Sequence, residues 1–442
     1  MTKLEFFVKS YLVMNEYEIV GDLGFNLSEF ELLSQFMLHK KPHIDWKVCD
    51  FEDYISYILE IRRQIKINSV SSNVAFLESS HLGLIRQAYQ KNYFQYSYQR
   101  YDLKLIDENW LDRIYNIQDP FFSSNGLFVK SGMSAFLVSI LTLKRLYPSF
   151  TSLHYAKDGY FEVNDMFTRY LNLYNVAYFS EENQHQPDIV ILDSTTAIVD
   201  KIQWINAKII IIDTTCWATT DPIINNLLGH LKDYSGLIIL VRSHIKLDCF
   251  GLEINRLGSI VILVNTSLSN VLYQFKDACH ETTCNIGCNF NIEDCYPWLF
   301  YKKFHELCKM RTNRIKYYTN KICDRLIKEK DIDFPVYKGQ HDLFIMAKFT
   351  RIPKSFNKKF KFGNPVMRYA RQVCEIAKKI GLPVVPSSSF GLCYSSFDGY
   401  LNRAGTEAYL RLAPSPNMNE TQADQIADFF IEWFAKGNRY QW

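Results

Sequence analysis

Six short apolar runs in the middle of the chain, separated by segments of helical character, restrict its fold more than any other feature. The run Ile209-Ile210-Ile211-Ile212 is continuously β-branched, which is typical of a strand buried on both faces of a parallel sheet. Strands that alternate with helices indicate a doubly wound, mostly parallel sheet. We therefore expect an α/β fold with strands near residues 126–129, 152–155, 189–192, 209–212, 237–241 and 260–264.

The rest of the chain has a different pattern. Residues 1–70 repeat apolar and aromatic side chains every three or four positions, which predicts helices, whereas residues 69–102 are rich in Tyr, Gln and Ser and are expected to form loops. Further expected elements are a strand at 343–349 and helices at 133–147, 162–174, 298–328 and 420–434. These patterns predict a helical amino-terminal extension (1–105), a large α/β domain (106–305) and a smaller α+β domain (306–442).

The composition is that of an ordinary globular protein of 442 residues, with 48% hydrophobic residues, 22% charged residues and a net charge of +3. So small a charge gives no argument for a nucleic-acid or membrane partner. No apolar run approaches the roughly 20 residues of a membrane helix, and residues 1–9 mix Lys and Glu into an apolar stretch, unlike a signal peptide. The eleven cysteines therefore indicate reduced thiols and a cytoplasmic location.

Two chemically informative side chains follow neighbouring predicted strands. Asp213 ends the 209–212 run, and Lys246 comes a few residues after the 237–241 run. Because ligands collect at the carboxyl ends of parallel strands, both side chains would lie in one crevice. A lysine amine there can form a Schiff base with an aldehyde, and an aspartate can keep a ring nitrogen protonated. These are the two groups that a pyridoxal phosphate enzyme needs most.

A third feature is a run of small residues, Ser131-Gly132-Met133-Ser134-Ala135, between the apolar residues 127–129 and a strongly helical segment. Small residues at a strand-to-helix turn leave backbone N–H groups accessible at the start of the helix. Such a helix start suits an anion, including a phosphate group. By itself the run indicates no more than a helix cap. Its meaning comes from its order and spacing relative to Asp213 and Lys246.

That order resembles the fold-type I pyridoxal phosphate enzymes, and within them the Cys/Met metabolism family of cystathionine synthases and lyases. The family's Ser-Gly-Met-x-Ala motif matches residues 131–135, and its Ser-x-x-Lys motif matches residues 243–246, with Gly251 following. Its Asp-x-Thr pattern matches residues 213–215, and its Tyr-x-Arg pattern matches residues 98–100. The resemblance covers about residues 93–430. It implies a mostly parallel, seven-stranded type of sheet and a smaller α+β carboxyl-terminal domain.

The resemblance also implies a role for each matched residue. Lys246 would form the Schiff base and later carry the substrate proton, and Asp213 would pair with the pyridine nitrogen. Tyr98 and Arg100 would reach the cofactor from a neighbouring subunit, Tyr98 with a catalytic role. A homodimer or homotetramer with shared active sites is therefore expected, with the extension as its arm. The other residues expected to bind pyridoxal 5′-phosphate are Ser131, Gly132, Met133, Tyr160, Thr215 and Ser243.

The resemblance also implies which residues contact the cofactor ring and the substrate. The cofactor ring would stack on Tyr155 or Tyr160, and Tyr160 is preferred because Asp158-Gly159-Tyr160 has the composition of a turn. Arg411 resembles the family's late arginine, whose guanidinium binds the substrate α-carboxylate. Ser388, in the small-residue segment 386–391, would line the substrate pocket.

The chain departs from the family in two places. The family's Glu-x-Pro-x-Asn-Pro segment is absent near Asp193, and its Gly-His-Ser-Asp run is absent after Lys246. The expected activity is β- or γ-elimination or replacement on a small amino-acid substrate. An aminotransferase is the first alternative, because residues 411–416 resemble that group equally well. A non-catalytic partner protein of the same fold is the second.

Two tempting site residues have simpler interpretations. His244 is expected to face away from Lys246, because neighbouring side chains along a strand alternate between its faces. The cluster Cys279, His280, Cys284, Cys288 and Cys295 lacks the paired spacing of a metal site, so no metal is expected. We interpret that segment as a mobile substrate-gating loop between domains.

Overall fold

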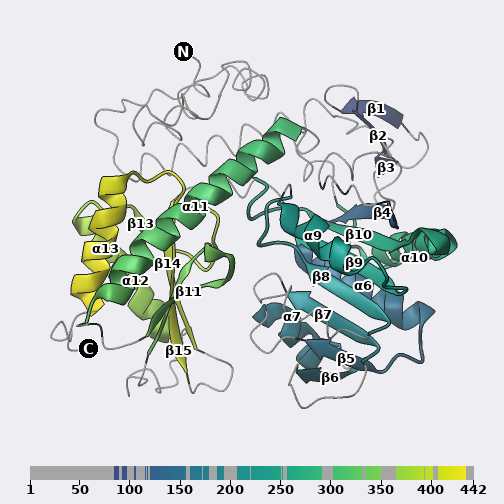
Figure 1. Cartoon of the computed structure of the whole chain (residues 1–442), viewed down its shortest axis with the longest axis horizontal. Helices are drawn as coiled ribbons and strands as arrows, with labels where there is room; N and C mark the ends of the chain where they lie inside the picture. Colours follow the sequence, from purple (N-terminus) through teal and green to yellow (C-terminus); the bar gives the residue numbers. More distant parts are fainter. Residues whose placement is uncertain are drawn as a thin grey trace. The chain divides into compact units, whose positions relative to one another are not determined.

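A computed structural model describes residues 84–88, 92–96, 104–105, 115, 117, 120–155, 160–171, 173–178, 187–193, 207–219, 221–249, 251, 256–290, 302–330, 332, 335–349, 365–392, 394–401 and 407–434. These residues belong to two compact units (Figure 1). The first unit holds the described residues up to Cys249 and those from Arg256 to Lys309. The second holds Gly251 and the described residues from Met310 onward.

The first unit contains a seven-stranded sheet. The strands β8, β9, β7, β5 and β6 pair in parallel, whereas β10 pairs antiparallel with both β9 and β4. All six predicted strands are confirmed, and the sheet is mostly parallel, as expected. In spatial order the strands are β4 (Phe122–Val129), β10 (Gly258–Asn265), β9 (Leu237–Ser243), β8 (Ile209–Asp213), β7 (Ile189–Asp193), β5 (Ser152–Tyr155) and β6 (Asn175–Tyr178).

Apolar side chains cover both faces of this sheet. Ile209 and Ile211 pack in the same core cluster as residues from the helices α6 (Gly132–Leu146) and α10 (Ser269–Ile286). Ile210 and Ile212, on the opposite face of the same strand, are equally inaccessible to water. This double burial explains why the strand is continuously apolar instead of alternating. The helix predicted at 162–174 is shorter, and consists of α7 (Phe161–Asp165) and a π-helical turn (Met166–Tyr170).

Two segments of the first unit differ from expectation. The region predicted to be loops contains β1 (Leu84–Ala88) and β2 (Asn92–Tyr96), which pair antiparallel, and β2 also pairs with β3 (Lys104–Leu105). The segment interpreted as a gating loop forms α10 through Ile286, followed by a left-handed Gly287 that ends the helix. The helices of this unit also include α9 (Pro222–His230).

The second unit is built on a five-stranded sheet. Its strands, in spatial order, are β11 (Val336–Lys338), β12 (Ile345–Lys348), β15 (Ala408–Ala413), β14 (Ser395–Leu401) and β13 (Val384–Pro386). The core of this unit includes Phe397 on β14 and Phe430 on α13 (Glu420–Phe434). The helix α12 (Pro365–Lys379) also contributes to this core. The predicted strand near 343–349 and the terminal helix are confirmed, as is the α+β character.

The long predicted helix is also confirmed, as α11 (Lys302–Lys328), and the boundary between the two units falls within it, between Lys309 and Met310. Within the described ranges, no helix combines the length and the apolar character needed to cross a membrane.

Candidate active site

The site is built on the edge of the large sheet where its parallel strands end. β8 and β9 pair so that Asp213 lies opposite Val241, which places the Asp213-Thr214-Thr215 turn beside the turn that carries Lys246. Two hydrogen bonds join these turns: the Ser243 N–H donates to Thr215 Oγ1 (3.0 Å), and the Thr214 N–H donates to the Val241 carbonyl (2.9 Å). The expected placement of Asp213, Thr215, Ser243 and Lys246 at neighbouring strand ends is therefore what the fold produces.

The start of α6 reaches the same edge because of strand register. Gly258 pairs with Val129 on one side and with Ser243 on the other, so β4 and β9 end at the same level of the sheet. A methyl group on Gly132 would lie only 2.8 Å from the Cβ of Ser243. The glycine is thus required by a close approach, and the sheet brings the 131–133 segment into contact with Ser243.

The first turn of α6 is suited to an anion. Ser131 is the N-cap, and its hydroxyl oxygen accepts a hydrogen bond from the Ser134 N–H (3.1 Å). The N–H groups of Gly132 and Met133 fall in the turn that has no intrahelical acceptors. No acidic residue lies in this first turn to repel an anion. The side chain of Met133 packs against the apolar core of the unit, so only its backbone can contribute to such a site.

A second buried carboxylate lies beside Asp213. Asp193 ends β7 in register with Asp213, and the two side chains are 1% and 7% exposed. Burial and the neighbouring Asp193 charge raise the pKa of Asp213 to about 7, although hydrogen bonds from Thr215 act in the opposite direction. The sequence pattern alone does not mark Asp193 as a site residue. The signal that could have found it is its position at the end of the strand adjacent to that of Asp213.

The two candidate tyrosines have different environments. Tyr155 is inaccessible to water, and its hydroxyl lies 2.9 Å from the Tyr160 carbonyl oxygen and 3.1 Å from Asp193 Oδ2. Burial and the charge of Asp193 raise the pKa of Tyr155 well above its ordinary value. Tyr160 precedes α7, donates its N–H to Asp193, and has a half-buried side chain packed against the core. Tyr160 therefore remains the better candidate for contact with a ligand.

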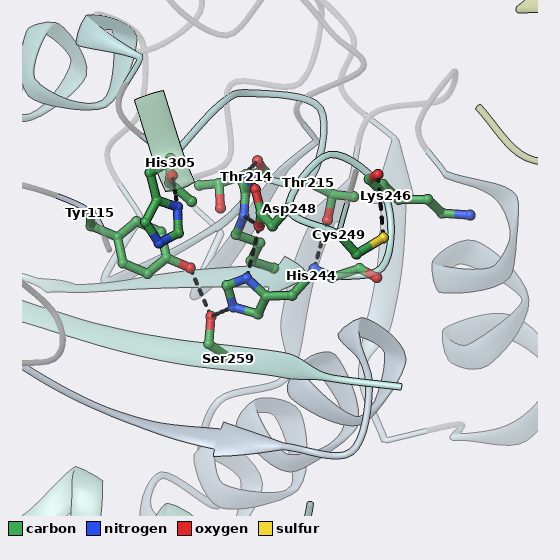
Figure 2. Close-up of polar contacts among 12 residues, drawn as sticks. Tyr115, Thr214, Thr215, His244, Lys246, Asp248, Cys249, Ser259 and His305 are labelled. Atoms are coloured by element: carbon green, nitrogen blue, oxygen red, sulfur yellow. Dashed lines mark hydrogen bonds and ion pairs between the residues drawn. The ribbon is translucent and has the colours of Figure 1, made fainter. Parts of the chain in front are cut away.

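Lys246 is half-buried in the turn after β9. Figure 2 shows its side chain extending away from His244 and Asp248. His244 is completely buried, with Nδ1 2.8 Å from Asp248 Oδ2 and Nε2 2.8 Å from Ser259 Oγ. The structure places His244 on the side of the turn that faces away from the lysine amine, as expected. The cause is the turn and not strand alternation, because both residues lie beyond Ser243, the last residue of β9, and residues two positions apart on a strand would share a face.

Arg411 lies in the second unit, on β15, where the sequence predicted a carboxylate-binding arginine. One of its terminal nitrogens donates to the Ser388 carbonyl oxygen, and the same nitrogen is 3.6 Å from Asp398 Oδ2. Burial raises the pKa of Asp398, and the positive charge of Arg411 opposes that shift. The guanidinium also lies over the Phe344 ring, at 5.6 Å. Arg411 and Ser388 are therefore brought together, through the Ser388 backbone.

Comparison with known proteins gives a likeness of fold. No family model matches the chain, and no curated protein matches its sequence. A cystathionine gamma-lyase from Micromonospora echinospora superposes with a TM-score of 0.50 at 12% identity, over 79% of this chain and 90% of that one. A cystathionine gamma-synthase from Xanthomonas oryzae pv. oryzae, solved with cystathionine, gives a TM-score of 0.50 at 13% identity, over 82% and 90%. The fold is that of the fold-type I pyridoxal phosphate enzymes.

Tyr98, Arg100 and Cys295 lie outside the described residues. Within those residues, no cluster of three or more His, Cys, Asp or Glu side chains has the arrangement of a metal site. Arg242 and Asp248, like Asp193, were not predicted as site residues, and both are buried beneath the Lys246 turn. A charged residue on each side of the lysine, six positions apart, was the available signal.

Proposed function

We propose that this chain is a pyridoxal phosphate-dependent enzyme that catalyses β- or γ-elimination or replacement on an amino acid. The observation that carries the proposal is the meeting of three distant segments at one sheet edge. The start of α6, the Asp213–Thr215 turn and the Ser243–Lys246 turn are joined there by strand register, by the Ser243–Thr215 hydrogen bond and by the close approach of Gly132 to Ser243.

The residues at this edge fit the cofactor chemically. The α6 start offers N–H groups and serine hydroxyls to the phosphate, without a nearby acidic residue in its first turn. Asp213 and Asp193 are two adjacent buried carboxylates, an arrangement that is unfavourable unless a cation or a shared proton compensates it. A protonated pyridine nitrogen at Asp213 would provide that compensation. Tyr160 is our candidate for contact with the ring.

When bound, the cofactor supplies an electron sink for a carbanion at the substrate Cα. The residues of the chain hold it and move protons. The Nζ of Lys246 is assigned to bond to the aldehyde carbon, with loss of one water molecule, and to carry the Cα proton. Asp213 is assigned to keep the pyridine nitrogen protonated. Ser131, Gly132, Met133, Thr215 and Ser243 are assigned to the phosphate, with Met133 contributing only its backbone.

We also propose the substrate contacts and the assembly. Arg411 would bind the α-carboxylate, since a guanidinium presents a planar pair of donors, and its site already includes the Ser388 carbonyl. Tyr98 and Arg100 are proposed to contribute from a neighbouring subunit of a homodimer or homotetramer. The division at 105/106 and 305/306 and a cytoplasmic location likewise remain predictions.

Elimination or replacement is preferred to transamination because structures of similar fold include a cystathionine gamma-lyase and a cystathionine gamma-synthase. The two reactions leave the cofactor in different forms. An aminotransferase would convert it to pyridoxamine phosphate with an amino donor and regenerate it with a 2-oxo acid. A lyase would release ammonia and a 2-oxo acid and keep the aldehyde form.

An absorption spectrum tests the proposal. Wild-type protein mixed with pyridoxal 5′-phosphate should develop a visible band that sodium borohydride removes. Lys246→Ala should not develop it, whereas the control Lys232→Ala, at an exposed lysine of the same unit, should behave as wild type. A wild type without the band would contradict the proposal and favour a non-catalytic partner protein.

A further inference from the structure

A fully buried polar network underlies the Lys246 turn (Figure 2). Its members come from separate segments: Arg242 and His244 at the end of β9, Asp248 in the turn, Ser259 on β10, and Tyr115 from before the sheet. All five side chains are at most 1% exposed. Hydrogen bonds run from Arg242 to Asp248, from Asp248 to His244 and from His244 to Ser259, and the Tyr115 hydroxyl lies 2.7 Å from Ser259 Oγ at the far end. The network therefore ties the lysine turn to three other parts of the fold.

The ion pair of this network closes the turn. Arg242 lies four residues before Lys246, and Asp248 lies two residues after it. The guanidinium donates Nε to Asp248 Oδ2 and Nη2 to Asp248 Oδ1, each at 2.6 Å, in a bidentate pair. Its remaining Nη1 donates to the Thr214 carbonyl oxygen, next to Asp213. One arginine thus connects both ends of the lysine turn to the turn that ends β8.

His244 holds the same carboxylate from the other side. Its Nδ1 is bonded to Asp248 Oδ2, its Nε2 to Ser259 Oγ, and its backbone N–H to the Leu257 carbonyl (2.9 Å). Burial lowers the pKa of His244, although Asp248 opposes the shift. The carboxylate of Asp248 remains ionised because Arg242, with help from His244, lowers its pKa despite the cost of burial.

The order Ser259–His244–Asp248 is that of a serine hydrolase triad, but the surroundings exclude that function. All three side chains are 0% exposed, so a substrate cannot reach the serine oxygen. That oxygen is also engaged by the Tyr115 hydroxyl. A triad needs an accessible nucleophile facing a reacting carbonyl. The network therefore acts by holding the turn of Lys246 in place.

We infer that Arg242, His244 and Asp248 are positioning residues that fix the Lys246 turn, so that its amine meets the cofactor aldehyde at the Asp213 edge. The inference rests on the proposed function. A buried ion pair often contributes little net stability compared with apolar side chains of similar volume, so stability alone does not account for this network. The network contacts the inner side of the turn, and the Lys246 side chain points away from the network, as Figure 2 shows.

Asp248→Asn tests the inference, because it keeps the shape of the side chain and removes its charge. Two ligands separate covalent attachment from noncovalent binding. Pyridoxal 5′-phosphate bonds to the lysine, whereas pyridoxine 5′-phosphate has no aldehyde and reports only the binding of the ring and the phosphate. We expect covalent attachment to be at least tenfold slower, measured from the visible band and from borohydride trapping. Affinity for pyridoxine 5′-phosphate should change less than twofold. Asp233→Asn, at an exposed aspartate, is the matched control.

Attachment at the wild-type rate in Asp248→Asn would overturn the inference. So would a parallel loss of attachment and of pyridoxine 5′-phosphate binding, which would indicate a general structural role. If Asp248→Asn does not fold, the paired variant Arg242→Met/Asp248→Leu replaces the whole ion pair with apolar side chains, and the same two criteria apply to it. Failure of the wild type itself to attach the cofactor would instead contradict the proposed function.

Discussion

Asp193 and Asp213 lie opposite each other across the pairing of β7 and β8, both buried, at the strand ends next to the Lys246 turn. Two adjacent carboxylates in such a place repel each other when both are ionised. In the cofactor-free protein burial raises the pKa of Asp213 most, and repulsion from Asp193 raises it further. The pair therefore favours a cationic group at this edge of the sheet.

The first prediction concerns the pH dependence of stability in the cofactor-free protein. Because the pKa of Asp213 rises from 3.8 unfolded to about 7 folded, its contribution to stability is complete below about pH 4 and is lost as the pH rises through about 7. The full loss is at most about 4 kcal/mol, since one pKa unit corresponds to about 1.4 kcal/mol. Asp213→Asn lacks this loss, so its urea midpoint should fall less between about pH 5 and pH 8 than that of the wild type.

A control variant is measured at the same two pH values. Asp233→Asn changes an exposed carboxylate of the same unit and should follow the wild-type midpoints. Equal pH dependence in wild type and Asp213→Asn would show that Asp213 does not titrate in this range and that the neighbouring carboxylate does not raise its pKa.

A second prediction compares two glycines in helices. A methyl at Gly132 would lie 2.8 Å from Ser243 Cβ, whereas one at Gly229, in α9, would meet no atom within 4 Å. Gly132→Ala must therefore displace the α6 start from Ser243, and we expect at least tenfold weaker binding of pyridoxine 5′-phosphate by calorimetry. Gly229→Ala should leave binding unchanged and stabilise its helix by about 0.5–1 kcal/mol. Similar affinities in the two variants would contradict the phosphate assignment.

The parts of the fold that could be predicted from the sequence were predictable for one physical reason. Strands buried on both faces must be apolar along their whole length, so β7, β8 and β9 are visible as runs of residues such as Ile209–Ile212. The residues that follow such runs lie at one edge of the sheet, and this placed Asp213 and Lys246 correctly. The small residues 131–135 were selected as the start of a helix after a strand, and the structure adds a reason for Gly132, whose close approach to Ser243 excludes a side chain.

What the sequence did not reveal depends on tertiary neighbours. The strands β1 and β2 have mixed polar and aromatic composition, and their pairing is set by each other rather than by a local apolar run. The helix α10 contains many polar residues and buries only a narrow stripe that includes Leu272, Phe275 and Cys279. Asp193 gains its meaning only from its register with Asp213. Arg242 and Asp248 gain theirs from contact across a turn.

A third prediction concerns Arg411. Arg411→Lys keeps a positive charge near Asp398 but loses the planar pair of donors that suits a carboxylate. With the standard amino acid that perturbs the wild-type cofactor band most, we expect the half-saturating concentration to rise at least tenfold. Attachment of the cofactor to the protein should stay as in wild type.

Arg145→Lys is a suitable comparison for Arg411→Lys. Arg145 is exposed on α6, where it pairs with Glu281, and its replacement should leave amino-acid binding unaltered. An unchanged half-saturating concentration in Arg411→Lys would remove Arg411 from the substrate site without affecting the assignment of Lys246.

The most direct test of the account is the position of the covalent bond. Wild-type protein is incubated with pyridoxal 5′-phosphate, reduced with borohydride and digested, and the modified peptide is sequenced by mass spectrometry. The account predicts a single stoichiometric adduct on Lys246, lost in Lys246→Ala and retained in Lys232→Ala. A stoichiometric adduct on another lysine, or equal labelling of the Lys246→Ala protein, would contradict it.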